Sequence, residues 1–121
     1  MGVTSALCEF LSRARYEDFS SEALHEARRS ILDWLGVALA GSRHPVVQIL
    51  MECLGEVGGR PQATVLGHKQ KLGFLDAALV NGAAGHVLDY DDTHMGGVIL
   101  HPSSPLMPAL LSTAERRPVS G

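Results

Sequence analysis

A short stretch of the chain holds half of its histidines and half of its aspartates. Residues 81–104 are otherwise made largely of Gly, Ala and aliphatic residues, yet they include His86, His94, His101, Asp89, Asp91 and Asp92. Imidazole changes its charge near neutral pH, and a carboxylate accepts protons and hydrogen bonds. Such a cluster can therefore carry acid–base chemistry, hold a metal ion, or order a polar loop that has no chemistry.

The spacing of these donors favours an acid–base site over a metal site. Neither the H-E-x-x-H pattern nor a Cys/His zinc pattern is present, and "DYDDTH" lacks the Gly and the distal Glu of a calcium loop. We therefore predict no metal and no cofactor. A capping or salt-bridging loop stays open as an alternative, because His86 alone can be an interior histidine and Asp92 alone can order an Asx-turn.

The cluster spans a predicted helix end, a glycine loop and the start of another helix. Residues 72–90 form an Ala- and Gly-rich helical pattern, and residues 91–100 form a loop with two glycines. If the helix persisted far enough, His86, Asp89 and Thr93 would share one face. Functional side chains commonly lie at such junctions, because the flanking helices hold a rigid scaffold.

The next helix is expected to begin between Pro102 and Pro108, with Ser103 or Ser104 as its cap. The proline after His101 favours an extended conformation at that histidine. His101 would then lie beside a helix N-terminus, whose unpaired N–H groups attract anions such as carboxylates. An imidazole beside an anion site is suited to moving a proton to or from a bound carboxylic acid.

Helical periodicity predicts three further helices, over residues 4–15, 20–40 and 45–57. "ATVLG" at residues 63–67 is too short for a helix and partly β-branched, which is typical of an extended segment. The predicted fold class is therefore all-α, with at most one short extended segment.

Composition narrows the classes of function. The chain has 121 residues, 45% of them hydrophobic, and a net charge of -3, which suits one modest domain. It has no run of Lys or Arg, so we expect no nucleic-acid partner. With no basic leader and no apolar stretch of about 18 residues, we expect no membrane association and a cytoplasmic location. Cys8 and Cys53 are expected to be buried, reduced thiols.

Four segments together resemble the MmgE/PrpD family: "RRSILDWLGVALAGS", "ATVLG", "AALVNGAAGHVLDYDDTH" and "HPSSPLMPALLSTAE". That family includes 2-methylcitrate dehydratase, cis-aconitate decarboxylase and iminodisuccinate epimerase. The resemblance covers nearly the whole chain from about Ser20. It implies that residues 1–121 are the incomplete N-terminal part of a helical domain that a much longer chain completes. It also implies a homo-oligomer and chemistry without a metal.

The resemblance further implies a lyase that acts beside a carboxylate of a small di- or tricarboxylate. By motif, the catalytic residues would be Asp89, Thr93 and His101. The same segment assigns Asp92, His94 and Ser103 to substrate binding. Dehydration of 2-methylcitrate is the expected reaction, with decarboxylation and epimerisation as competing outcomes. The alternative is a catalytically silent remnant that associates through exposed apolar faces.

Overall fold

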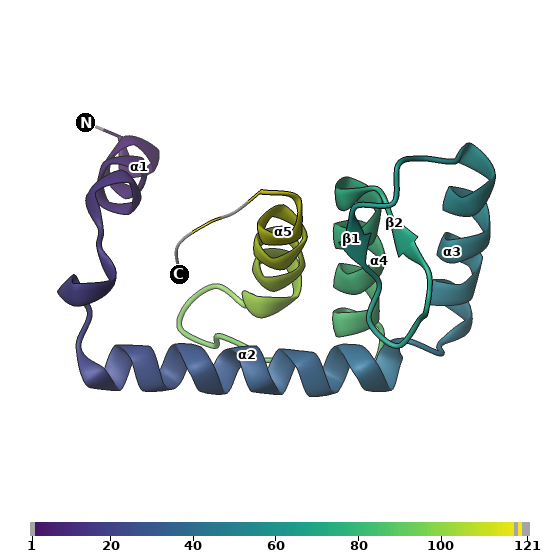
Figure 1. The fold of residues 1–121 in the computed structure, drawn as a ribbon. Coiled ribbons are helices and arrows are strands. Elements are labelled where there is room, and N and C mark those ends of the chain that lie inside the picture. Colours follow the sequence, from purple (N-terminus) through teal and green to yellow (C-terminus); the bar gives the residue numbers. More distant parts are fainter. Residues whose placement is uncertain (1, 118, 120–121) are drawn as a thin grey trace.

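In the computed structural model, which describes residues 2–117 and 119, the chain is mostly α-helical, with one small hairpin at the end where the helices Pro45–Val57 and Phe74–His86 lie (Figure 1). Within those residues the helices are α1 (Val3–Arg13), α2 (Ser21–Gly41), α3 (Pro45–Val57), α4 (Phe74–His86) and α5 (Ser103–Arg116), and a 3-10 turn (Tyr16–Asp18) precedes α2. Strands β1 (Ala63–Thr64) and β2 (Lys71–Leu72) pair antiparallel, with Ala63 opposite Leu72. The predicted all-α fold class is confirmed.

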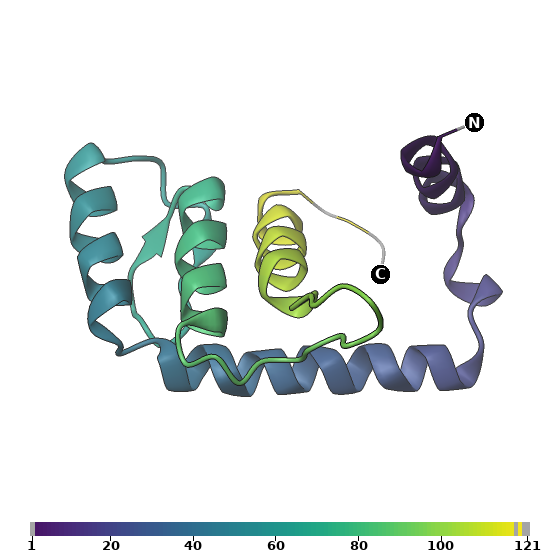
Figure 2. The same cartoon turned by 180° about the vertical axis from the view of Figure 1, so that it is seen from behind.

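The long helix α2 forms a base against which α4 and α5 stand side by side (Figures 1 and 2). The hairpin lies between α3 and α4, where its strands complete one apolar core. That core consists of Val47, Ala63, Val65, Leu72, Ala77, Val80 and Ala84. Asn81 of α4 ties the hairpin down, since its side chain bonds Thr64 O and Leu66 N, each at 2.9 Å. The segment between α4 and α5 therefore connects two helices that pack against each other and against α2.

Local sequence signals explain most helix ends. The Ser20 hydroxyl accepts from Ala23 N and caps α2, and Pro45 opens α3 as predicted. Three details differ from prediction. The N-cap of α5 is Pro102, and Ser103 and Ser104 lie inside the helix, so the predicted cap at one of these serines is wrong. A second strand, β2, pairs with the predicted extended segment, and α4 ends at His86, four residues before the predicted end at Tyr90.

The sequence also predicted two buried cysteines and no membrane-spanning helix. Cys8 and Cys53 are both free, but both are exposed, so their predicted burial is wrong. Cys8 lies on α1, whose residues are all described and none of which is buried. Among the helices of the described residues, none has the length and apolarity needed to cross a membrane.

Helices α2 and α4 approach closely because small residues face each other. A Cβ at Gly41 would collide with the carbonyl oxygen of Ala84, and a Cβ at Gly85 would collide with the indole of Trp34. The Trp34 side chain is 1% exposed, so it has no room to move away. This contact brings the end of α4, with His86, down onto α2.

Substituting Gly41→Ala is therefore expected to lower the free energy of unfolding by about 2 kcal/mol, the typical cost of overfilling a packed contact. Gly36→Ala is the matched control, because a Cβ at Gly36 in the same helix meets nothing within 4 Å. That change should stabilise the chain by about 0.5–1 kcal/mol through helix propensity. Urea denaturation of the two variants measures both effects. Equal midpoints would contradict the predicted contact.

Candidate acid–base site

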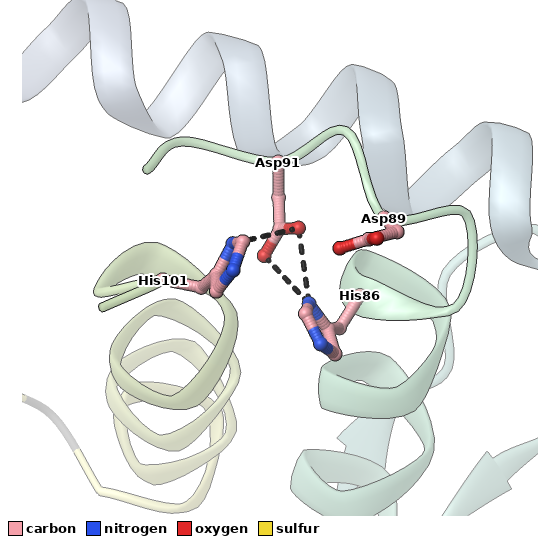
Figure 3. Close-up of side chains that lie close together, drawn as sticks. All are labelled: His86, Asp89, Asp91 and His101. Atoms are coloured by element: carbon pink, nitrogen blue, oxygen red, sulfur yellow. Dashed lines mark hydrogen bonds and ion pairs between the residues drawn. The ribbon is translucent and has the colours of Figure 1, made fainter. Parts of the chain in front are cut away.

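A buried aspartate, Asp91, lies at the centre of the polar cluster (Figure 3). Its side chain is 0% exposed. The two carboxylate oxygens lie 3.0 and 3.2 Å from Nδ1 of His86, and one of them lies 3.3 Å from Nδ1 of His101. The hydroxyl of Ser104, at the start of α5, also donates to this carboxylate. One carboxylate thus joins the end of α4 to the beginning of α5.

The two imidazoles come from different helix junctions but lie against each other. Their ring centroids are 4.7 Å apart in an edge-on arrangement. His86 is the last residue of α4, and His101 precedes α5 by two residues. Oγ1 of Thr93 lies 3.4 Å from Nδ1 of His101, and the Thr93 hydroxyl donates to the backbone carbonyl of Asp91 at 3.1 Å.

Asp89 reaches the cluster through a left-handed turn rather than along a helix. Its φ is 53°, and its N–H donates to His86 O at 2.8 Å, which closes the turn directly after α4. Aspartate tolerates this backbone region better than most residues. The helix does not persist to Asp89, so the condition for a helical face shared by His86, Asp89 and Thr93 is not met. Asp89 nevertheless places a carboxylate oxygen within 4.8 Å of donor atoms of His86, Asp91 and His101.

The Asp92 side chain caps the start of α5 by accepting two hydrogen bonds from Ser103. The N–H of Ser103 donates to Asp92 Oδ1 at 3.1 Å, and the Ser103 hydroxyl donates to Oδ2 at 2.7 Å. The chain's own carboxylate therefore binds at the first turn of α5, where the sequence predicted an external anion. The assignment of Asp92 and Ser103 to substrate binding stays a prediction.

His94 lies apart from the cluster. Its backbone pairs with Leu100 in an isolated bridge, and its ring packs over Gly96 within the exposed loop. Its predicted contact with substrate is likewise untested. The structure thus brings together Asp89, Thr93 and His101 from the predicted set, and it leaves His94 outside.

Removing the cap on α5 should have a moderate effect on stability. We expect Asp92→Ala to lower the free energy of unfolding by about 1 kcal/mol, the typical loss for an N-terminal cap. Asp33→Ala, at an exposed position of α2, is the control and should be neutral or slightly stabilising, because Ala has the higher helix propensity. Thermal unfolding followed by circular dichroism compares the two. An unchanged midpoint for Asp92→Ala would show that the cap contributes nothing.

The surroundings of Asp91 keep its carboxylate charged. Burial raises its pKa, but the hydrogen bonds from Ser104 and His86 outweigh burial and hold the pKa of Asp91 below its usual value of 3.8. Asp91 is consequently an acceptor at neutral pH. This charged carboxylate faces Nδ1 of both imidazoles and so orients both rings.

A groove of about 460 Å³ runs beside the histidines, between α4 and α5. Its walls are mostly apolar and include Leu79 and Ala83 of α4 and Pro105 and Pro108 of α5. His86 and His101 both line it. Among the described residues that form its wall, none is Lys or Arg, so the two histidines are its only basic side chains.

The cluster also gathers donors of the kind that bind divalent cations. One N or O atom from each of His86, Asp89, Asp91 and His101 lies within 4.8 Å of the others. Imidazole and carboxylate both bind Zn²⁺, but Nδ1 of His86 already faces both oxygens of Asp91. A metal at that nitrogen would have to displace this hydrogen bond. The arrangement thus favours acid–base chemistry, and the absence of a metal and a cofactor from the function stays a prediction.

His86 and Asp91 organise the site, although neither was among the predicted catalytic or substrate-binding residues. No hydrophobic period marks Asp91, because its burial depends on Ser104, 13 residues later on another helix. The one hint in the sequence was the number of aspartates, because three aspartates within four residues are more than one helix cap requires. That number does not identify which of the three is buried.

The domain model for "MmgE/PrpD N-terminal domain" matches residues 5–121 of this chain. A cis-aconitate decarboxylase from Aspergillus terreus is 32% identical over 94% of the chain, and 23% of that relative is covered. Cis-aconitate decarboxylase from Homo sapiens is 29% identical over 98% of the chain and 24% of the relative. The Cis-aconitate decarboxylase-like protein oryM of Aspergillus oryzae is 28% identical over 93% and 23%, respectively.

The chain thus spans about a quarter of the length of the curated relatives it matches. These relatives are named as decarboxylases, so the similarity supports the lyase family but does not support 2-methylcitrate dehydratase specifically. The match nevertheless extends over both helices that hold the acid–base cluster. The chain belongs to the MmgE/PrpD family and corresponds to the N-terminal portion of its members.

Proposed function

We propose that this chain is the N-terminal part of a lyase that removes CO2 from a small unsaturated tricarboxylate of the cis-aconitate class. The observation that carries the proposal is the pairing of His101 with the charged Asp91 beside an open groove. The names of the relatives favour decarboxylation over the dehydration of 2-methylcitrate that the sequence resemblance first suggested. A cytoplasmic location and a homo-oligomer belong to the same proposal.

The chemistry requires one proton carrier and a place for the substrate's remaining charge. When the bond to the departing carboxyl group breaks, its electron pair stays on the carbon skeleton, which takes up one proton in place of CO2. His101, in its protonated form, donates that proton and regains one from water. Asp91 faces Nδ1 of His101 and holds the ring in place. The carboxylate of Asp89, within 4.8 Å of ligand atoms of His86, Asp91 and His101, would accept a hydrogen bond from a protonated carboxyl group of the substrate.

Binding and turnover of cis-aconitate test the proposal. Adding cis-aconitate to the folded chain should shift the side-chain NMR signals of His86 and His101 and leave those of His25, an exposed histidine of α2, unchanged. Release of CO2 is followed in the same sample, and 2-methylcitrate is run in parallel for loss of water. A folded chain that shows neither shifts nor consumption of either substrate would support the silent-remnant alternative.

A further inference from the structure

We infer that Asp91 is a positioning residue that fixes His86 and His101 in one tautomer, with the proton on Nδ1, and that His86 is a second proton carrier at the groove. The catalytic part of this inference rests on the proposed function. The tautomers themselves follow from the hydrogen bonds and can be observed without any reaction.

The hydrogen-bond partners of His86 allow only one position for its ring proton. Its Nδ1 lies 3.0 and 3.2 Å from the two oxygens of Asp91. An ionised carboxylate only accepts hydrogen bonds, so Nδ1 must be the donor. The proton of a neutral His86 therefore sits on Nδ1, and Nε2 carries the free electron pair.

The ring proton of His101 is placed in the same way, by two acceptors. Nδ1 of His101 lies 3.3 Å from Asp91 Oδ1 and 3.4 Å from the hydroxyl oxygen of Thr93. Thr93 has a single hydroxyl proton, which it donates to the backbone carbonyl of Asp91. It can then only accept from His101, so both neighbours of Nδ1 require a proton there. This gives Thr93 a physical role, since its hydroxyl holds the ring without touching substrate.

Both imidazoles consequently present Nε2 as the reactive nitrogen. Within each ring the two nitrogens point in divergent directions, so an Nδ1 that faces Asp91 leaves Nε2 facing away from it (Figure 3). His86 is half exposed, at 50% of its side chain, and His101 is exposed at 27%. Because both rings line the groove, a ligand there meets two proton carriers on one shared carboxylate.

The tautomers are measured directly by long-range ¹H–¹⁵N NMR of the imidazole rings in the 121-residue chain, at a pH where both are neutral. A free imidazole in water favours the proton on Nε2, so the inference expects the reverse at His86 and His101. His25 serves as the internal reference for the ordinary tautomer. An Nε2–H form at either His86 or His101 in the unmodified chain would overturn the assignment. Since the unmodified chain decides it, no variant needs to fold.

Variants then separate positioning from a purely structural role. In Asp91→Asn, a backbone ¹H–¹⁵N spectrum checks the fold, and His86 should shift toward the Nε2–H form. Thr93→Val should disturb His101 alone, and Thr93→Ser, which keeps the hydroxyl, should restore it. Unchanged tautomers in a folded Asp91→Asn chain would refute positioning by Asp91.

Turnover of cis-aconitate tests His86 as a proton carrier. His86→Gln should lower the rate at least tenfold relative to His25→Gln, and an unchanged rate would refute this role. If the tautomers are as inferred but the unmodified protein neither binds nor consumes cis-aconitate, the proposed function fails and the positioning of the rings stands. If turnover occurs with the opposite tautomers, the positioning inference fails and the proposed function stands.

Discussion

Replacing His101 by Gln is expected to lower the rate of cis-aconitate decarboxylation by about 10²- to 10⁴-fold, the typical contribution of a general acid or base. Gln has similar size and polarity and can bond to Asp91 and Thr93, but it cannot carry a proton at neutral pH. The change should therefore act on the rate constant kcat more than on KM. Steady-state kinetics in any form of the protein that turns over cis-aconitate measure the two separately.

The matched control is His25→Gln, which makes the same substitution on the exposed face of α2, away from the groove. It should leave kcat unchanged within about twofold, because surface substitutions of this kind change little. A His101→Gln protein that keeps its fold and its full kcat would exclude His101 as the proton donor. The decarboxylase proposal would then have to rest on other side chains.

Replacing Asp91 by Ala is expected to lower the free energy of unfolding by about 3 kcal/mol. Removal of one partner from a buried ion pair typically costs about 3–5 kcal/mol, and the lower end applies here because His86 is half exposed. The substitution leaves the Ser104 hydroxyl without its acceptor and releases the two helix ends that the carboxylate joins. Chemical denaturation monitored by circular dichroism gives the difference.

Asp89→Asn is the comparison for this effect, because Asn tolerates the left-handed backbone of residue 89, where Ala would add strain. The Asp89 side chain is exposed, so loss of its charge should cost well under half as much. Comparable losses at both positions would mean that the position of Asp91 between α4 and α5 has no special weight in the fold.

The stabilisation by Asp91 should also depend on pH in a defined direction. Because the folded state lowers the pKa of Asp91, the carboxylate stabilises the fold fully above its unfolded pKa of about 3.9 and loses this contribution as pH falls through the folded pKa. The difference in unfolding free energy between the unmodified chain and Asp91→Asn should thus narrow over the range from neutral pH to below about 4. A difference that is constant over this range would show that the charge of Asp91 does not contribute.

Much of the scaffold was predictable because its signals are local. Apolar residues at helical spacing, the cap at Ser20 and the proline at residue 45 each act within a few residues of chain, so four of the helices appear where the pattern places them. The end of α4 was placed too late, because the apolar residues Val87 and Leu88 continue the helical pattern past His86. The left-handed turn at Asp89 stops the helix there, and no apolar spacing encodes that turn.

By itself, the sequence determined which chemistry was available: imidazoles and carboxylates concentrated at a break between two helices. It also determined the family, through the segments that surround Asp89, Thr93 and His101. Only the tertiary structure decided how the carboxylates divide their work. Asp92 binds the first turn of α5, while Asp91 turns inward to two imidazoles and Ser104. The physical reason is that burial of a charge depends on partners from another helix. Consecutive residues of a loop point in different directions, so the local sequence does not show which aspartate meets those partners.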